Sequence, residues 1–170
     1  MNDPILTEFL QQAVSQLEDK TQKIGTCLQE LTEEEIWQRP NKSSNSVGNL
    51  ILHLCGNITQ YIISSLGETE DKRERDKEFS TPGGRSKKEL FDLLTATVAN
   101  VNEVINHTDP QKALHIRSVQ GFEYSAIAII LHVVEHFSYH TGQIIFWVKL
   151  LKDKDLGFYA NLDLNKKNII

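Results

Sequence analysis

The segment from Ile127 to Leu151 constrains the fold more than any other part of this sequence. It is apolar almost all round a helix, which is typical of a helix that its neighbours bury. Imidazole, amide and charged side chains nevertheless interrupt it at His132, Glu135, His136, His140, Gln143 and Lys149. These interruptions argue against a membrane span, because polar groups are costly in lipid. The sequence therefore predicts a helix that begins at Ser125 and ends near residue 151, inside a helical protein.

Three further helices are predicted upstream, because apolar residues recur there at helical spacing and capping residues precede them. The expected helices are residues 4–30 after Asp3-Pro4, a helix from the polar run 41–46 to Gly67, and a helix from Ser86 to about residue 107. Together with the histidine-bearing helix, they predict an all-α fold, a four-helix bundle. In such a bundle, sites are formed by side chains that project inward from facing helices.

The segments between and after these helices are expected to lie on the surface. Residues 67–79 contain six acidic and four basic residues, and charge runs of this kind are usually solvated loops. The stretch 111–124 lacks a helical period and is expected to cross the bundle as an extended loop. Beyond a core of about residues 4–151, the polar tail 152–170 is expected to dock only partly. The whole chain, 1–170, is predicted to be a single domain.

Charge and cysteine usage exclude several classes of protein. The chain has 18 Lys and Arg against 23 Asp and Glu, a net charge of −5, whereas nucleic-acid binders neutralise phosphates with basic patches. No secretory signal is visible after Met1, since a basic and then an apolar segment are both missing. Cys27 and Cys55 form no CxxC pair and are interpreted as small core residues. We therefore expect a cytoplasmic protein that binds neither nucleic acid nor membrane.

Three histidines share one face of the helix that begins at Ser125. His132, His136 and His140 follow one another at i, i+4 and i+8, within an arc of about 80°. Buried imidazoles need partners, because each unpaired buried polar group costs roughly 1–3 kcal/mol. A metal ion would provide one, although hydrogen-bonded packing or an interface would do so as well. Since His132 and His140 lie about 12 Å apart along the axis, only one adjacent pair can bind a single ion.

A third ligand would have to come from another part of the chain. His53 lies between apolar residues in the middle of its helix and is expected to be buried. His107 and His115 flank a proline turn and are expected to be exposed. Cys55 would point away from His53, because two residues along a helix turn by about 200°. The residue pattern alone leaves the third ligand open among the three remaining histidines.

Other motifs for metal or nucleotide chemistry are missing from the sequence. No ExxH pair occurs, which excludes the carboxylate di-iron pattern of helical bundles. No HExxH occurs, which excludes a thermolysin-type protease. The sequence also contains neither GxxxxGK[ST] nor GxGxxG, so nothing in it indicates a site for nucleotide phosphates.

The histidine block resembles that of a known family. Residues 132–144 read HVVEHFSYHTGQI and are similar to the HxxxHxxxHxGQ signature of the DinB-like superfamily, also called YfiT-like. Residues 31–40 and 46–57, around His53, are similar to the first-ligand region of that family. Residues 73–79 resemble a subgroup whose members have no assigned function. The resemblance covers about residues 5–151 and is most specific in the histidine block.

This resemblance implies an up-down-down-up four-helix bundle, commonly a homodimer, that holds a divalent metal with three histidines. Carried over residue by residue, the ligands are His53, His136 and His140. His132 would then contact a ligand or pack in the core. Zinc or nickel would suit such a site best, and iron or manganese would also be compatible. A helix that is apolar on all sides, as in 125–151, also fits a homodimer.

Three neutral imidazoles would leave coordination positions open, as in catalytic zinc sites. A water in such a position can become hydroxide near neutral pH, and a thiol can be held there as thiolate. The resemblance implies either use, because some family members resemble low-molecular-weight thiol S-transferases and others are described as metal-dependent hydrolases. We therefore expect a metal-dependent enzyme with a small-molecule substrate. The alternative is a non-catalytic metal- or ligand-binding helical-bundle protein.

The sequence also predicts the surroundings of four other polar or aromatic residues in the same helix. Gln143 follows His140 on the histidine face, where it would orient a bound water or substrate, or contact another helix. Glu135 is expected to face another helix or a partner subunit. Tyr139 and Trp147 flank the histidine face and are expected to line the core.

Overall fold

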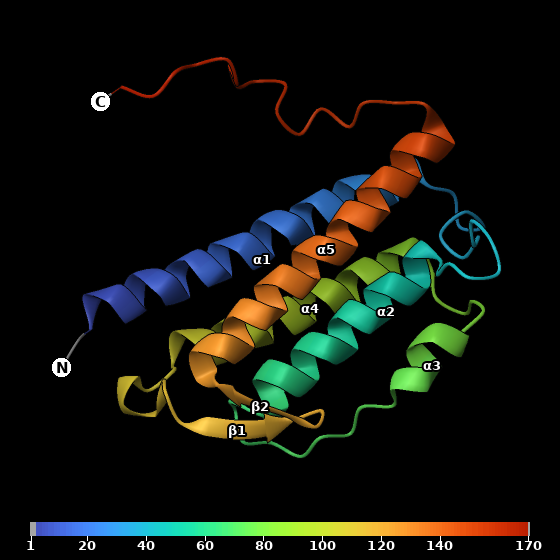
Figure 1. Ribbon diagram of the computed structural model, residues 1–170. Helices are drawn as coiled ribbons and strands as arrows, with labels where there is room; N and C mark the ends of the chain where they lie inside the picture. The colour runs from blue at the N-terminus through green and yellow to red at the C-terminus, as the bar shows by residue number, and fades with distance from the viewer. Residues whose placement is uncertain (1–2, 170) are drawn as a thin grey trace.

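The computed structural model describes residues 3–169, which are mostly helical (Figure 1). The elements in chain order are α1 (Pro4–Glu30), α2 (Val47–Ile58), a π-helical segment (Thr59–Ser64), α3 (Arg75–Ser80), α4 (Lys87–Asn106), a 3₁₀ turn (Pro110–Lys112), β1 (Ile116–Val119), β2 (Phe122–Ser125) and α5 (Ala126–Lys152). The four long helices lie side by side. Helix α1 packs against α4 and α5, and α2 packs against the same two helices. In Figure 1, α1 and α5 run in one direction, while α2 and α4 run in the other.

Local capping explains where the long helices begin. The Asp3 carboxylate accepts hydrogen bonds from the first backbone N–H groups of α1, and Pro4 occupies the first helical position. Ser46 and Ser86 begin α2 and α4 with reciprocal capping boxes, and the Ser125 hydroxyl accepts from the N–H of Ala128 at the start of α5. The starts predicted for α1, α4 and α5 are therefore confirmed.

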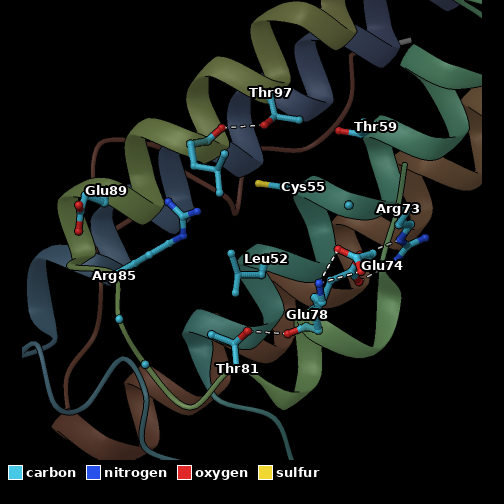
Figure 2. A pocket seen from close by; sticks show the side chains of 15 residues that line it. Leu52, Cys55, Thr59, Arg73, Glu74, Glu78, Thr81, Arg85, Glu89 and Thr97 are labelled. Carbon is cyan, nitrogen blue, oxygen red and sulfur yellow. Dashed lines mark hydrogen bonds and ion pairs between the residues drawn. The ribbon is translucent and has the colours of Figure 1, made fainter. Parts of the chain in front are cut away.

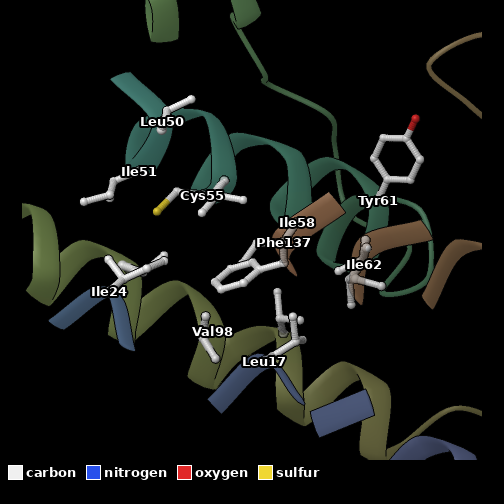
Figure 3. Close-up of a cluster of buried hydrophobic side chains, with 14 of the residues drawn as sticks. Leu17, Ile24, Leu50, Ile51, Cys55, Ile58, Tyr61, Ile62, Val98 and Phe137 are labelled. Carbon is white, nitrogen blue, oxygen red and sulfur yellow. The ribbon is translucent and has the colours of Figure 1, made fainter. Parts of the chain in front are cut away.

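A continuous hydrophobic core lies between the four long helices (Figure 3). Helix α1 contributes a stripe at three- and four-residue spacing, in which Leu17 and Ile24 have no exposed surface. Ile51 and Ile58 of α2 and Phe137 of α5 are equally buried. Full burial of a side chain of this size stabilises the fold by about 1.5–3 kcal/mol. This packing holds α2 and α5 at a fixed distance from each other.

The stretch 111–124 is not an extended loop, so the expectation of an all-α fold is wrong in this part. Strands β1 and β2 pair antiparallel, with Val119 opposite Phe122. Gln120 and Gly121 join them, and both residues have positive φ, 52° and 83°. Two successive residues of this kind form the tight turns whose twist matches that of a hairpin. Two strands of four residues are too short to give a clear alternating pattern, which explains why the sequence did not reveal them.

Two other regions differ from their sequence-based expectations. The charged segment 67–79 contains most of α3, and Glu78 is buried there. Helix α5 is not covered on all sides, because Leu131, Tyr139, Phe146 and Leu150 are each more than half exposed. The prediction that Tyr139 lines the core is therefore wrong, whereas Trp147 is partly buried against the core.

The segment after α5 returns along α1. Lys152, at the end of α5, forms an ion pair with Glu35. In the segment itself, Lys154 pairs with Glu30 at the end of α1, and Tyr159 accepts from Lys23 of α1. Phe158 packs against the core, while most other residues of the segment are exposed. Partial docking of the tail is thus what the structure shows. Among residues 3–169, no helix combines the length and the apolar character that crossing a bilayer requires.

Candidate metal centre

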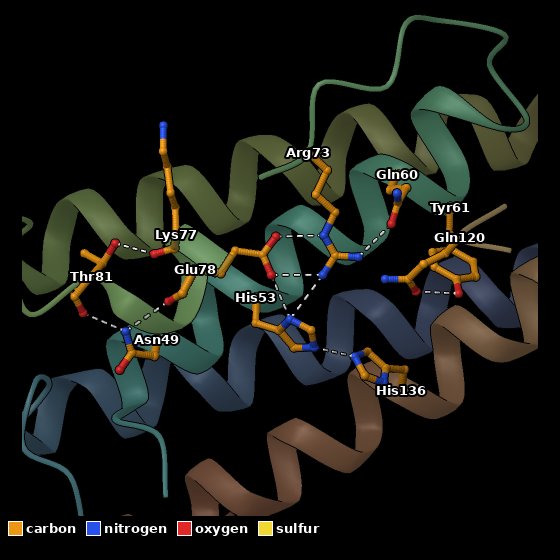
Figure 4. A network of polar contacts seen from close by, with 10 residues as sticks. All are labelled: Asn49, His53, Gln60, Tyr61, Arg73, Lys77, Glu78, Thr81, Gln120 and His136. Atoms are coloured by element: carbon orange, nitrogen blue, oxygen red, sulfur yellow. Dashed lines mark hydrogen bonds and ion pairs between the residues drawn. The ribbon is translucent and has the colours of Figure 1, made fainter. Parts of the chain in front are cut away.

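The packing of α2 against α5 brings three histidines from distant parts of the sequence together. His53 of α2 and His136 and His140 of α5 each offer a ring nitrogen, and these nitrogens all lie within 4.8 Å of one another. The two Nε2 atoms of His53 and His136 are 2.9 Å apart (Figure 4). His53 is 5% exposed, and the other two histidines are partly buried. Helix α5 supplies two of the three rings, because residues four apart lie on one face of a helix.

In two of the three rings, those of His53 and His140, Nδ1 forms a hydrogen bond. His53 Nδ1 lies 2.8 Å from Glu78 Oε2, and a carboxylate only accepts, so Nδ1 donates. In the neutral imidazole, Nε2 then holds the lone pair. His140 Nδ1 donates in the same way to Gln143 Oε1 at 2.7 Å, which leaves its own Nε2 free. Partners of this kind fix the tautomer and the ring orientation of metal-binding histidines. The donor set therefore fits a metal ion.

His132 lies outside this group. Its ring stacks on Tyr61 with centroids 4.5 Å apart and on His136 with centroids 5.6 Å apart. Tyr124 of β2 continues the stack at 6.1 Å. The Tyr61 hydroxyl donates to Gln120 Oε1 in the hairpin turn. His132 thus packs between aromatic rings and supports His136 from the side of the hairpin.

The Glu78 carboxylate belongs to a buried ion pair that sequence reasoning missed. Arg73 donates to Oε1 from Nε at 2.7 Å and to Oε2 from Nη2 at 2.9 Å. Arg73 Nη2 also lies 3.2 Å from His53 Nδ1, but neither of these groups accepts when Nδ1 holds its proton, so the carboxylate is the partner of both. Gln60 accepts from Arg73 Nη1 at 2.8 Å. The sequence signal was misleading here, because eight other charged residues surround these two in the 67–79 run.

The electrostatic surroundings favour the neutral form of the two α5 imidazoles, His136 and His140. Burial lowers the pKa of His136 to about 3, and the neighbouring histidines add to this shift. Burial also lowers the pKa of His140, although the hydrogen bond to Gln143 opposes it. Burial alone would raise the pKa of Glu78, but the hydrogen bonds from Arg73 and His53 outweigh it and hold that pKa below its usual range. Neutral imidazole is the form that binds metals.

A family model described as "Protein of unknown function (DUF1572)" matches residues 4–163. The chain belongs to this family. The match extends past the predicted core boundary at residue 151, so part of the C-terminal segment is a family feature. A search of curated proteins gives no match.

Solved structures resemble this DUF1572 chain over most of their length. A conserved protein from Enterococcus faecalis has a TM-score of 0.70 and 17% identity, with 85% of this chain and 97% of that chain covered. The DinB-like protein YjoA from Bacillus subtilis has a TM-score of 0.66 and 15% identity, with coverages of 87% and 96%. A DinB-like protein from Bacillus cereus has a TM-score of 0.66 and 18% identity, with coverages of 87% and 93%. These likenesses confirm the DinB-like fold that the histidine block predicted.

Other predicted candidates of the DUF1572 chain lie away from the three histidines. His107 and His115 are exposed, as expected. Cys27 and Cys55 are buried free thiols, and burial raises the pKa of each to about 12. Both cysteines are therefore unreactive core residues at neutral pH. Glu135 is exposed.

Two cavities adjoin the site on different sides. A cavity of about 730 Å³ lies between α2, α3 and α4 (Figure 2), lined by Cys55, Arg85 and Glu78 among others. Glu78 therefore stands between this cavity and His53. A second cavity, of about 480 Å³, begins at Gln143, beside His140. Its lining residues are uncharged: Pro40, Asn41, Ser43, Ser44, Asn45, Val47, Leu50, Gln143, Ile144, Phe146, Trp147 and Leu150.

Proposed function

We propose that the protein is a metal-dependent enzyme in which His53, His136 and His140 hold one divalent metal ion and leave coordination positions open. The observation that carries this proposal is the convergence of three ring nitrogens from two helices within 4.8 Å. When bound, the ion would supply a Lewis acid that lowers the pKa of a coordinated water or thiol toward neutrality. The proposed reaction is a hydrolysis or a transfer to a low-molecular-weight thiol.

The residues around the histidines support a small, uncharged substrate. The cavity beside Gln143 has hydroxyl and amide groups on the 41–45 loop and apolar side chains on α5. A neutral molecule with one polar end fits such a lining, because no charged side chain offers an ion pair there. Gln143 would position the polar end, since it lines the cavity and its Oε1 already accepts from His140.

Three broader features belong to the same proposal. The directions of the four long helices support an up-down-down-up bundle formed as a single domain. The exposed apolar side chains of α5, Leu131, Tyr139, Phe146 and Leu150, support a homodimer, because patches of this kind often mark interfaces. The reduced, buried cysteines support a cytoplasmic location.

Metal content would test the ligand assignment. We expect elemental analysis of the purified protein to find close to one divalent metal per chain, with zinc or nickel favoured over iron or manganese. His53→Ala, His136→Ala and His140→Ala should each reduce the content at least tenfold. His107→Ala is the matched control, because His107 is exposed and is not one of the three histidines whose ring nitrogens converge. Equal metal content in all four variants would contradict the assignment.

Turnover would test whether the centre is catalytic. The metal-loaded protein would be assayed with ester and amide substrates and with pairs of a small thiol and an electrophile. We expect activity that chelation removes and that His136→Ala abolishes. A full complement of metal without turnover on any substrate class would instead support the alternative, a non-catalytic metal- or ligand-binding protein.

A further inference from the structure

The charged connection between α2 and α4, residues 67–85, places one carboxylate, that of Glu78, in contact with the histidine group. The Glu78 side chain is 10% exposed and that of Arg73 is 3% exposed, which is unusual within a run of ten charged residues. Both carboxylate oxygens are used: Oε1 accepts from Arg73, and Oε2 accepts from Arg73 and from His53. Hydrogen bonds between ionised groups are the stronger kind, and a two-pronged arginine contact also fixes the carboxylate plane.

Stability alone does not explain this arrangement. A buried ion pair adds little net stability, because desolvation of the two charges offsets their attraction. Arg73 would neutralise Glu78 without the third contact, yet Oε2 is directed at Nδ1 of a ring whose Nε2 faces the other two histidines. We propose that Glu78, held by Arg73, is the positioning residue of the metal centre and couples the connection 67–85 to metal binding; this inference rests on the proposed function.

The charges of the pair suit this role. Arg73 and Glu78 sum to zero, so the carboxylate orients His53 without adding net negative charge to the centre. A metal ion on three neutral imidazoles would then keep its full positive charge. Glu78 itself is not a fourth ligand, because its oxygens contact Nδ1, on the side of the ring away from Nε2.

The anchoring of α3 explains why the connection would respond to the metal. Asn49 of α2 donates to the backbone oxygens of Glu78 and Thr81, at 3.0 and 2.8 Å. Gln60, in the π-helical segment, donates to Asp71 and accepts from Arg73. The connection is therefore attached on both sides of His53, through Asn49 before it and Gln60 after it, and α3 itself packs against α2. By linkage, a metal that fixes the His53 ring would also stabilise the attached connection, and the converse holds as well.

Substitutions at Glu78 would test the positioning role through metal affinity, measured by competition with a chromophoric chelator loaded with zinc. Glu78→Ala should weaken zinc binding by about 10- to 100-fold, the usual effect of losing the hydrogen-bond partner of a metal ligand. Glu78→Gln should recover part of this loss, because its amide oxygen still accepts from Nδ1. Glu74→Ala is the control: Glu74 is exposed, and within residues 3–169 its carboxylate pairs only with Lys77. Equal affinities for Glu78→Ala and wild type would overturn the inference.

Gly56→Ala provides an independent test that removes neither a ligand nor a charge. A Cβ atom at Gly56 would overlap Glu78 Oε1 and press on Arg73 Nε. We expect the carboxylate to be displaced and zinc affinity to fall as in Glu78→Ala. Gly142→Ala on α5 is the matched control, since a Cβ there meets nothing within 4 Å. Circular dichroism would verify that both variants fold, and unchanged zinc affinity in a folded Gly56→Ala would count against the role of Glu78.

Two readouts separate positioning from a merely structural contact. In nitrogen NMR spectra of the zinc-free protein, His53 should carry its proton on Nδ1, and Glu78→Ala should give a mixture of tautomers. Trypsin should cleave after Lys72, whose side chain is 76% exposed, more slowly when zinc is bound, and Glu78→Ala should lose this protection. Zinc binding by wild type without either effect would overturn this inference alone. Failure of wild type to bind any metal would overturn the proposed function together with it.

Discussion

Helix α5 and the connection 67–85 both contribute to the histidine group, but in physically different ways. Helix α5 supplies His136 and His140 through local geometry, since a four-residue spacing places both rings on one face. The connection supplies Glu78 and Arg73 through long-range contacts with His53 and Gln60 of α2 and the adjoining π-helical segment. The difference teaches that ligand rings can be found from spacing, whereas the groups that orient them depend on how distant segments dock.

The largest effect should come from breaking the ion pair of the connection. Arg73→Ala would leave the Glu78 carboxylate buried without its charge partner, which costs about 3 kcal/mol of unfolding free energy. Denaturant unfolding of the zinc-free protein would measure this loss. Arg73→Ala combined with Glu78→Ala should recover much of it, because no uncompensated charge remains. A double variant as unstable as Arg73→Ala would show that the arginine stabilises the connection by other contacts.

An intermediate effect should appear on the α5 side as a dependence of stability on pH. The pKa of His136 is lowered from 6.5 to about 3, so between these values the unfolded chain binds more protons than the folded one. The free energy of unfolding of the metal-free protein should therefore fall as the pH decreases from about 6.5. Above about pH 7, the contribution of His136 to this free energy should no longer change with pH.

Thermal unfolding between pH 7 and 5, in the presence of chelator, would check this sign, because carboxylates titrate mainly below that window. His136→Gln should show a shallower decline of the unfolding midpoint than wild type. His107→Gln, at an exposed position, should follow wild type. Identical slopes for His136→Gln and wild type would mean that the α5 histidine does not carry the effect.

The smallest effect should come from Gln143, the α5 counterpart of Glu78. Gln143→Ala removes the acceptor of His140 Nδ1, but this acceptor is a neutral amide three residues away on the same helix. A neutral hydrogen bond contributes about 1 kcal/mol, so zinc affinity should weaken by less than tenfold. Competition with the chelator would compare the zinc affinities of Gln143→Ala and Glu78→Ala directly. A loss larger than that of Glu78→Ala would reverse the proposed order of the two regions.

The sequence predicted the features that depend on interactions between residues close together in the chain. The helix starts at Asp3, Ser86 and Ser125 follow from capping chemistry that involves only the next three residues. The faces of His136 and His140 follow from the helical repeat. The residue pattern leaves His53 as one of three candidates, and only the family resemblance selects it, because no local sequence pattern indicates which helix packs against α5.

The remaining features depend on contacts that no local pattern contains. Glu78 is 25 residues from His53 in the sequence, so its burial could not be distinguished from the solvation expected of its charged neighbours. The exposure of Tyr139 depends on which sides of α5 the other helices cover. The hairpin turn at Gln120-Gly121 lies between strands too short to show a period.

The π-helical segment after α2 has a consequence for the register of the whole helix. Leu54, Ile58, Ile62 and Leu66 repeat every four residues, and in a regular α-helix such a repeat drifts round the axis by about 40° at each step. The bonds from Ser65 to Gln60 and from Gly67 to Ile62 span five residues, so each turn of this segment holds more residues and the drift is reversed. The wider turn keeps the four side chains against the core, and it allows Gln60 to reach Arg73 while Tyr61 stacks on His132. Removing one residue from this turn would rotate both out of register with their partners.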